Sequence, residues 1–243
     1  MAIQTGLNSR LYVEGNDLSG DANGFDISQT RQSYEVTTLD SGAFKRLEDG
    51  LVDATVGVSA FFDAASSRIS AVATANSGTL PSVDQDVLIP FGADVGSACA
   101  GFTAKQSDYI TTGAVGSPMT VSVNYTINAV SPMMGKMLTA HDDTITSSTS
   151  GTAVDDSSSS SDGGSWCYQI LAFSAVGGNA RWIANVQHSS DDDTYTDVIT
   201  EIITAVGAGS GTFTGTLNRY VKNRVVLDAS SGSITFAISY VRA

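Results

Sequence analysis

The sequence predicts a mainly β protein, with an N-terminal β-sandwich or barrel that carries one short helix and a C-terminal β-sandwich after it. Val52–Ser59 and Met119–Ile127 alternate apolar and polar side chains, which is the period-two pattern of half-buried strands. In the second half, candidate strands recur about every 8–15 residues between Gly, Ser and Asp turns, a spacing typical of sandwiches. A chain of 243 residues with 42% hydrophobic residues can build such cores.

The first part contains long strands joined by polar connections. We expect strands at 24–28, 52–62, 83–91, 98–110 and 118–129. The connection Ser33–Asp49 is expected to be a long loop. A short helix is expected over Ala64–Ala73, with Asp63 as its N-cap, because Ile69, Val72 and Ala73 follow the i, i+3, i+4 spacing of one apolar stripe.

A segment of unusual composition divides the chain. Thr139–Gly164 is rich in Ser, Thr, Asp and Gly, and such a composition buries too little apolar surface to offset the entropy of ordering. We therefore expect a domain at 1–138, an exposed loop or linker at 139–164 and a second domain at 165–243. Strands of the second domain are expected at 166–175, 181–188, 197–205, 211–217, 219–226 and 233–241.

The charge balance and the cysteines limit the function and the compartment. The formal net charge is −13, which argues against a basic surface that grips DNA. Cys99 and Cys167 are interpreted as buried hydrophobic residues, with an interdomain disulfide as the less favoured alternative. Met1–Gly6 lacks the features of a secretory signal, and no apolar run reaches the roughly 18–20 residues of a membrane span. The protein is expected to be made in the cytoplasm.

Residues that could carry chemistry are few. His188 is followed by Ser189 and Asp191–Asp193, but neighbours on a strand point to opposite faces, so a catalytic triad is not expected there. Asp191–Asp193 could attract calcium, yet the run lacks the spacing of a calcium loop and is interpreted as an acidic turn. His141 lies in the polar segment without a neighbouring nucleophile. We expect no catalytic residue, no cofactor and no metal ion.

Aromatic residues in the second domain allow a sugar-binding interpretation, because carbohydrate rings stack on aromatic faces. Trp182 shares a strand face with Ala184 and Val186 and is therefore expected in the core. The other aromatic residues that invite this interpretation are Trp166, Tyr168, Tyr195 and Tyr220. A receptor- or glycan-binding β-sandwich of a virion or cell surface is the alternative function.

Several segments resemble a known family. The turn that contains Leu18–Gly20, the segment from Gly50 to Asp63 and the order of strands over residues 9–130 resemble the tail tube (major tail) proteins of phages with long, non-contractile tails, the siphoviruses. The second part is similar to C-terminal domains attached to some tail proteins of actinobacteriophages. The resemblance implies a structural virion protein in the tail.

The resemblance also implies an assembly. Copies would form stacked hexameric or pseudo-hexameric rings, other tail proteins would bind the ends of the tube, and genomic DNA would pass through the lumen during ejection without specific binding. We assign subunit contact to the Ser33–Asp49 connection, because its apolar residues Val36, Leu39, Phe44 and Leu47 would be unusual in a free loop. The alternative is a loop that packs on its own domain.

Overall fold

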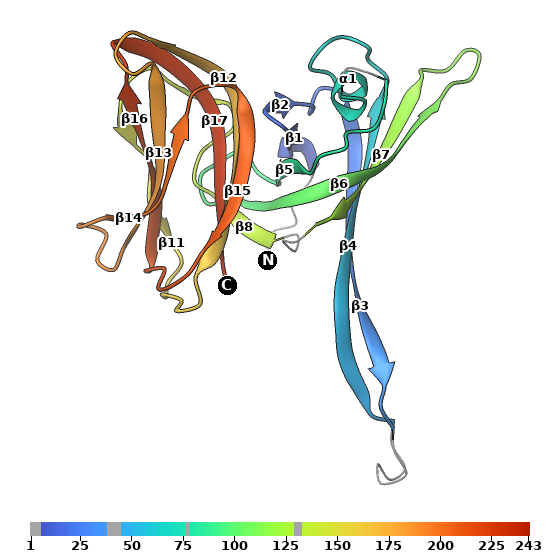
Figure 1. Ribbon diagram of the computed structural model, residues 1–243, viewed down its shortest axis with the longest axis horizontal. Helices are drawn as coiled ribbons and strands as arrows, with labels where there is room; N and C mark the ends of the chain where they lie inside the picture. Colours follow the sequence, from blue (N-terminus) through green and yellow to red (C-terminus); the bar gives the residue numbers. More distant parts are fainter. Residues whose placement is uncertain (1–5, 38–44, 76–77, 129–132) are drawn as a thin grey trace.

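The computed structural model describes residues 6–37, 45–75, 78–128 and 133–243, and it confirms a mainly β protein with one short α-helix (Figure 1). A 3-10 turn (Gly6–Asn8) precedes the first strand. The elements of the N-terminal half are β1 (Tyr12–Val13), β2 (Asn16–Asp17), β3 (Ala22–Glu35), β4 (Leu47–Phe61), α1 (Ile69–Ala73), β5 (Gln85–Pro90), β6 (Ala98–Thr112), β7 (Thr120–Ile127) and β8 (Met133–Met137).

The N-terminal half is an antiparallel sheet folded over a core. β3, β4, β7 and β6 are neighbours in that order, and β5 and then β1 and β2 follow β6 on its other side. The alternation predicted for β7 is confirmed at Val121, Val123 and Tyr125, which are buried under α1 and β5, whereas Met119 is 46% exposed. The opposite faces of these strands carry the polar residues.

The helix begins later than the sequence indicates. We predicted Asp63 as the N-cap, but Asp63 accepts a hydrogen bond from Ala65 N in a preceding turn, and α1 runs only over Ile69–Ala73. The buried carboxylate of Asp21 accepts from Ile69 N (3.0 Å) and lies 3.3 Å from an Arg68 nitrogen. A carboxylate 48 residues earlier therefore accepts from the first N–H group of the helix, which would otherwise lack a partner. This long-range capping sets the start of α1. The predicted apolar stripe of Ile69, Val72 and Ala73 is buried, as expected.

The C-terminal half is a sandwich of two sheets. Its elements are β9 (Asp143–Ile145), β10 (Thr149–Ser150), β11 (Val154–Asp155), β12 (Gly164–Val176), β13 (Arg181–Ser189), β14 (Thr196–Ile203), β15 (Gly207–Phe213), β16 (Tyr220–Asp228) and β17 (Ser231–Arg242). One layer contains β15, β12, β17 and β9, and the other contains β10, β16, β13 and β14, with β11 also paired to β16. Trp182 is fully buried between them, which confirms its predicted place in the core, together with Phe236 and Tyr240 of β17.

The expected linker at 139–164 forms structure instead. Within this segment β10 and β11 both pair with β16, and β9 pairs with β17. Asp156 lies next to β11 and is 9% exposed at its side chain. Its carboxylate accepts from Lys136 Nζ (2.7 Å), from Tyr240 OH (2.6 Å) and from Arg242 Nε (2.5 Å). Hydrogen bonds from three side chains of two strands, β8 and β17, order a segment that its composition alone could not order.

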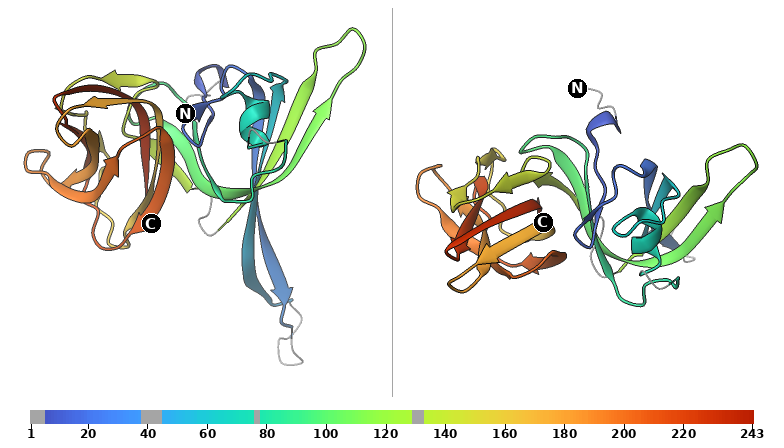
Figure 2. Two further views of the ribbon diagram at one scale, coloured as in Figure 1. Left: turned by 45° about the horizontal axis from the view of Figure 1, so that its top comes forward. Right: turned by 90° about the horizontal axis from the view of Figure 1, so that it is seen from above.

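The two halves are joined through a shared sheet and close contacts (Figure 2). β8 pairs with both β6 and β17, so the larger sheet continues from one half into the other. The turn between β1 and β2 reaches the sandwich, where Gly15 N donates to the fully buried Gln169 Oε1 (2.7 Å). A Cβ on Gly15, whose φ is +75°, would lie 2.7 Å from Ile170 O. Only glycine fits this backbone approach.

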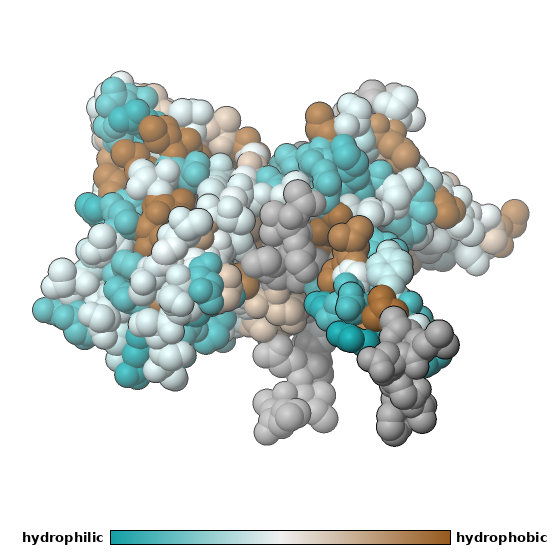
Figure 3. All heavy atoms as spheres, turned by 60° about the horizontal axis from the view of Figure 1, so that its bottom comes forward, coloured by the Kyte–Doolittle hydropathy of each residue, from teal (hydrophilic) through white to brown (hydrophobic). Residues whose placement is uncertain are grey.

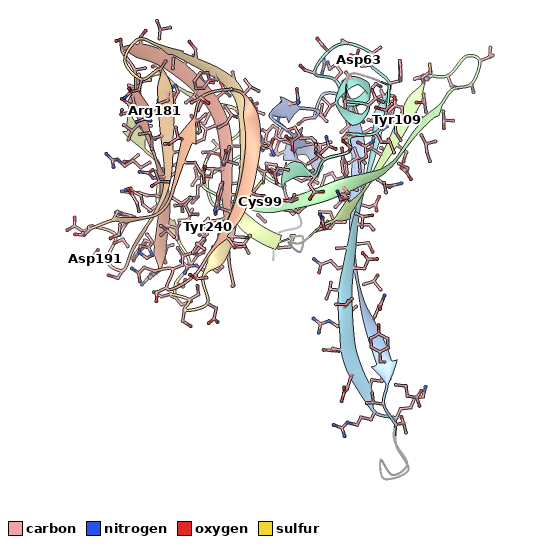
Figure 4. All side chains as sticks on the ribbon, viewed as in Figure 1. Asp63, Cys99, Tyr109, Arg181, Asp191 and Tyr240 are labelled. Carbon is pink, nitrogen blue, oxygen red and sulfur yellow. The ribbon has the colours of Figure 1, made fainter. Side chains whose placement is uncertain are left out.

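Both cysteines lie at this junction. Cys99 of β6 and Cys167 of β12 are buried beside Tyr12, Leu88 and Met137, and both are free thiols, so the disulfide alternative is wrong (Figure 4). Burial raises the pKa of the Cys99 thiol to about 12, which keeps it protonated. Within the described ranges, no helix is long and apolar enough to cross a membrane.

Candidate functional site

The most distinctive surface is an arm formed by the outer parts of β3 and β4. The two strands pair from Ala22 and Ala60 outward to Glu35 and Leu47, and they project beyond the rest of the molecule (Figure 1). From Ser28 to Glu35 every side chain is exposed, so no other described segment covers either face of the arm there. We call residues 28–53 the arm.

The arm is held together by its own ladder and by exposed ion pairs. Arg31 lies 2.6 Å from Asp49, Lys45 lies 2.7 Å from Glu35, and Val36 N donates to Arg46 O (2.9 Å). Exposed pairs of this kind contribute at most about 1 kcal/mol each. A two-stranded ribbon without a packed face is only marginally stable in water. Contacts within this chain therefore stabilise the arm only weakly.

The predicted contact residues have different outcomes. Ser33–Asp49 was expected to be a loop, but Ser33 and Asp49, Tyr34 and Glu48, and Glu35 and Leu47 are paired strand residues. Backbone pairing between two strands needs no burial, and hydrophobic patterning therefore misses it. Leu47 is 58% exposed and Val36 is half-buried, while Leu39 and Phe44 lie outside the described residues.

Other apolar residues of the arm were not predicted as contacts. Tyr34 is 54% exposed, Leu51 is 77% exposed and Val52 is 47% exposed. The alternation of Val52–Ser59 predicts that Val52 is half-buried, but the alternation continues past the point where the core ends. On the face shown in Figure 3, hydrophobic residues form small groups among polar ones.

β3 also has an open edge. Among the described strands β3 pairs only with β4, so the N–H and C=O groups on its other side have no strand partner over 14 residues. Proteins usually shorten, twist or cover such an edge, because it is a template for pairing with another chain. The open edge and the exposed arm are therefore two parts of one surface suited to association.

The sheet of β3, β4, β7 and β6 has a second feature, which we call the uncovered face. Residues that alternate with the buried ones lie on it in register: Asp26 pairs with Gly57, Gly57 with Asn124, and Asn124 with Asp108. Small polar members of the face are Ser28, Thr55, Ser59, Ser122 and Thr126, and at its α1 end the exposed Phe61 and Ile110 share it. The polar half of the alternation in β7 was visible in the sequence, but its role was not recognised there.

The charges of the uncovered face are mainly acidic. Asn124 Nδ2 donates to both oxygens of Asp108 (3.0 and 2.9 Å), and Asn124 N donates to Asp108 Oδ1, so this carboxylate is held flat against the sheet. A Cβ on Gly57 would lie 2.5 Å from Asp26 Oδ1, which shows that the Asp26 side chain leans across the glycine. Lys105 shares the face and forms an ion pair with Asp84 (2.9 Å). The face thus offers hydroxyl groups and carboxylates.

The residues weighed for catalysis are not brought together. His188 Nδ1 accepts a hydrogen bond from Asn218 N (3.1 Å), whereas the buried Ser189 donates its hydroxyl to Asp191 Oδ1 (2.7 Å). Asp191 Oδ1 also accepts from the backbone N–H groups of Asp193 and Thr194, and the bond from Ser189, followed by these two, lowers the pKa of Asp191. Figure 4 shows Asp191 at an outer turn of the sandwich.

The pKa values of both histidines are lowered, mainly by burial. Burial and then the charge of Arg242 lower the pKa of His188, and burial and then Arg10 lower that of His141. Within the described part of the chain, no group of three or more His, Cys, Asp or Glu residues could hold a metal ion.

The aromatic residues of the sandwich have occupied faces. Trp166 and Tyr168 stack on each other with ring centroids 5.3 Å apart. Lys222 Nζ lies 3.5 Å from the centroid of Tyr195, and Arg219 lies over Tyr220 at 4.8 Å. Each of these contacts occupies one face of a ring. The glycan-binding alternative stays a prediction.

Comparisons with known proteins give weak likenesses. No protein-family model and no curated protein matches this chain. Solved structures that align include the tail of an empty gene transfer agent particle refined with C6 symmetry, at 16% identity over 45% of this chain and 79% of that chain, with a TM-score of 0.36. The virion of a native gene transfer agent aligns at 17% identity over 53% of this chain and 96% of that chain, with a TM-score of 0.40.

A third alignment covers more of the sequence. The SPP1 Dit (gp 19.1) protein, described as a hub adsorption apparatus protein of phages that infect Gram-positive hosts, aligns at 11% identity over 94% of this chain and 98% of that chain, with a TM-score of 0.34. All three structures belong to tail or virion assemblies. TM-scores of 0.34 to 0.40 are too low to carry an argument, so the function proposed below rests on the chain's own surfaces.

Proposed function

We propose that this chain is a structural virion protein that assembles into stacked rings and forms a phage tail tube. The observation that carries the proposal is the arm together with the open edge of β3. In the described part of the chain, the arm exposes apolar side chains and β3 has no strand on its outer edge, and a head-to-tail contact between copies would cover both. A contact of this kind closes into a ring when its rotation completes a circle.

The uncovered face supports the passage of DNA. In a ring built by continuing the sheet of β3, β4, β7 and β6 from copy to copy, one face of that sheet points to the lumen. The uncovered face suits this place, because most of its residues are polar and its charges are mainly acidic, and DNA affinity comes largely from basic groups that neutralise phosphates. DNA would therefore slide through the lumen without being held.

Six copies of the chain per ring suit the two halves better than three. A ring of three would need the C-terminal half to repeat the tube fold. That half instead has two facing sheets, and its described residues include neither a helix nor an arm like that of β3 and β4. The sandwich would then lie on the outside of the tube, and other tail proteins would bind the tube's ends.

The test is assembly of the purified protein, followed by electron microscopy at increasing concentration. Wild-type protein should form tubes of stacked rings. A variant in which Arg31–Val52 is replaced by Asn-Gly should remain folded but form no tubes, since Thr30 and Asp53 are paired and a two-residue turn can join them. Asp192→Asn, in the exposed turn of the sandwich, is the control and should assemble normally. Monomers at all concentrations, or tubes from the armless variant, would contradict the proposal.

A further inference from the structure

A pocket lies between α1 and the β1–β2 turn and is not explained by the fold. Its volume is about 290 Å³. The polar part of its lining includes Glu14, Asn16, Ser66 and Gln85. The apolar part is formed by Val72, Ala75, Pro81 and Val83.

Two acceptor groups in this pocket are incompletely paired within the described part of the chain. Gln85 is 4% exposed, and its Oε1 has no hydrogen-bond partner among the described residues. A buried amide oxygen without a donor costs about 1–3 kcal/mol. Glu14 accepts from Asp86 N (2.6 Å) through Oε1, but the described residues give it no cationic partner. Burial raises the pKa of Glu14, as does the charge of Asp86, so the carboxylate is poorly compensated.

The lining identifies the chemistry of a ligand. Carboxylate and amide oxygens favour a cationic donor, and the apolar wall favours a hydrocarbon stem attached to it. A bare metal ion would leave most of such a volume and the apolar wall unused. Arg and Lys side chains combine a methylene stem with a charged head, and Arg offers five N–H donors to several acceptors at once.

One basic residue of this chain is placed to supply that group. Nine of the twelve basic side chains form ion pairs with described carboxylates, and Lys222 lies over Tyr195. Among the described residues, only Arg46 and Arg224 have neither kind of contact. Arg46 lies at the outer end of the arm, where its N donates to Thr37 Oγ1 (3.1 Å) and its O accepts from Val36 N.

The arm and the pocket lie at opposite ends of the molecule. Figure 1 shows the arm pointing away from α1, whose residue Val72 lines the pocket. In a head-to-tail stack, the outer end of one arm therefore approaches the α1 end of the next copy. We propose that the pocket receives the Arg46 side chain of a second copy stacked on the first. This inference rests on the proposed function and adds the contact that sets the register between rings.

Charge variants of Arg46 test the contact through assembly. Arg46→Glu should raise the critical concentration for tube growth about ten-fold or more, because each subunit added loses a charge-assisted contact. Arg46→Lys should raise it less. Arg224→Glu, on β16, makes the same charge change at the other unpaired cation and should have no effect. Circular dichroism and thermal melting of each variant show whether it is folded.

A second measurement identifies the neighbour of the pocket directly. Ser66→Cys at the rim is labelled with a photo-crosslinker and mixed in a small fraction into wild-type tubes; Cys99 and Cys167 are buried and should not react. Mass spectrometry should find the crosslink on the peptide of another chain that contains Arg46. Normal tubes from Arg46→Glu, or a crosslink elsewhere, overturn the contact and leave the proposed function standing. If the wild-type protein forms no tubes, both the Arg46 contact and the proposed function are overturned.

Discussion

The two halves of this protein differ in how far the faces and edges of their strands are covered. In the C-terminal sandwich, the two sheets bury each other's inner faces, and the longer of the edge strands β14 and β15 has eight residues. In the N-terminal half, β3 continues for 14 residues, most of them exposed, and keeps one edge open. The sandwich is therefore complete as a single chain, whereas the arm is not. Stability should reside in the first region and association in the second.

The largest expected effect is a loss of stability in the sandwich. Trp182 is fully buried, and its Nε1 donates to Ser174 O (3.1 Å). Trp182→Ala should lower the free energy of unfolding by about 3–5 kcal/mol, because it leaves a cavity and an unpaired carbonyl. Tyr34→Ala, on the arm, should change it by no more than about 0.5 kcal/mol while weakening assembly. Chemical denaturation of the unassembled proteins measures both changes. Equal losses of unfolding free energy in the two variants would contradict the claim that stability resides in the sandwich.

A smaller effect is expected where the two halves meet. Gly15→Ala should destabilise the protein by about 1–3 kcal/mol, since its Cβ would meet Ile170 O and Gly207 N at 2.7 Å. Gly116→Ala is the matched control, because Gly116 has a φ of +84° and nothing within 4 Å of an added Cβ. The control shares the backbone cost of about 1 kcal/mol without the clash. Thermal melting at one pH compares the two, and equal shifts would show that the close approach is unimportant.

The smallest effect concerns pH. The pKa of Glu14 is raised in the folded protein by burial and by Asp86, so its contribution to stability is present below the ordinary value of 4.5 and is lost as pH rises through the folded pKa. Glu14→Gln keeps an acceptor for Asp86 N but cannot ionise. The unfolding free energy of this variant minus that of wild type should therefore increase as the pH rises from 4 to 7. Melting curves across that range test it, and parallel pH profiles would contradict it.

The strands were predictable because their pattern is local. The faces of β7 and β17 follow from alternation over a few residues, and Trp182 could be placed in the core on the same grounds. The strand order that brings Asp26, Asn124 and Asp108 into one row depends on pairing between distant segments. Composition and periodicity carry no information about that pairing.

The differences from the sequence predictions share this cause. Thr139–Gly164 was expected to be an exposed loop or linker, but its β10 and β11 pair with β16, more than 60 residues away, and its Asp156 accepts from Tyr240 of β17. The helix start depends on Asp21, and the outer arm pairs without burying either face. The pocket that contains Glu14 and Gln85 gives no sequence signal, since its members come from four separate segments.

β17 has a mechanical consequence. Its Phe236 and Ile238 pack inside the sandwich, while its Ala237 packs with Cys99 and Met137 at the junction, and it pairs with β12 from Ser231 to Arg242. The rungs of an antiparallel ladder run perpendicular to the strands. A load applied along β17 at its C-terminal end would therefore be shared by all its rungs in shear, rather than breaking them one at a time. Tension on the sandwich would pass through this strand and through β8 into the N-terminal sheet.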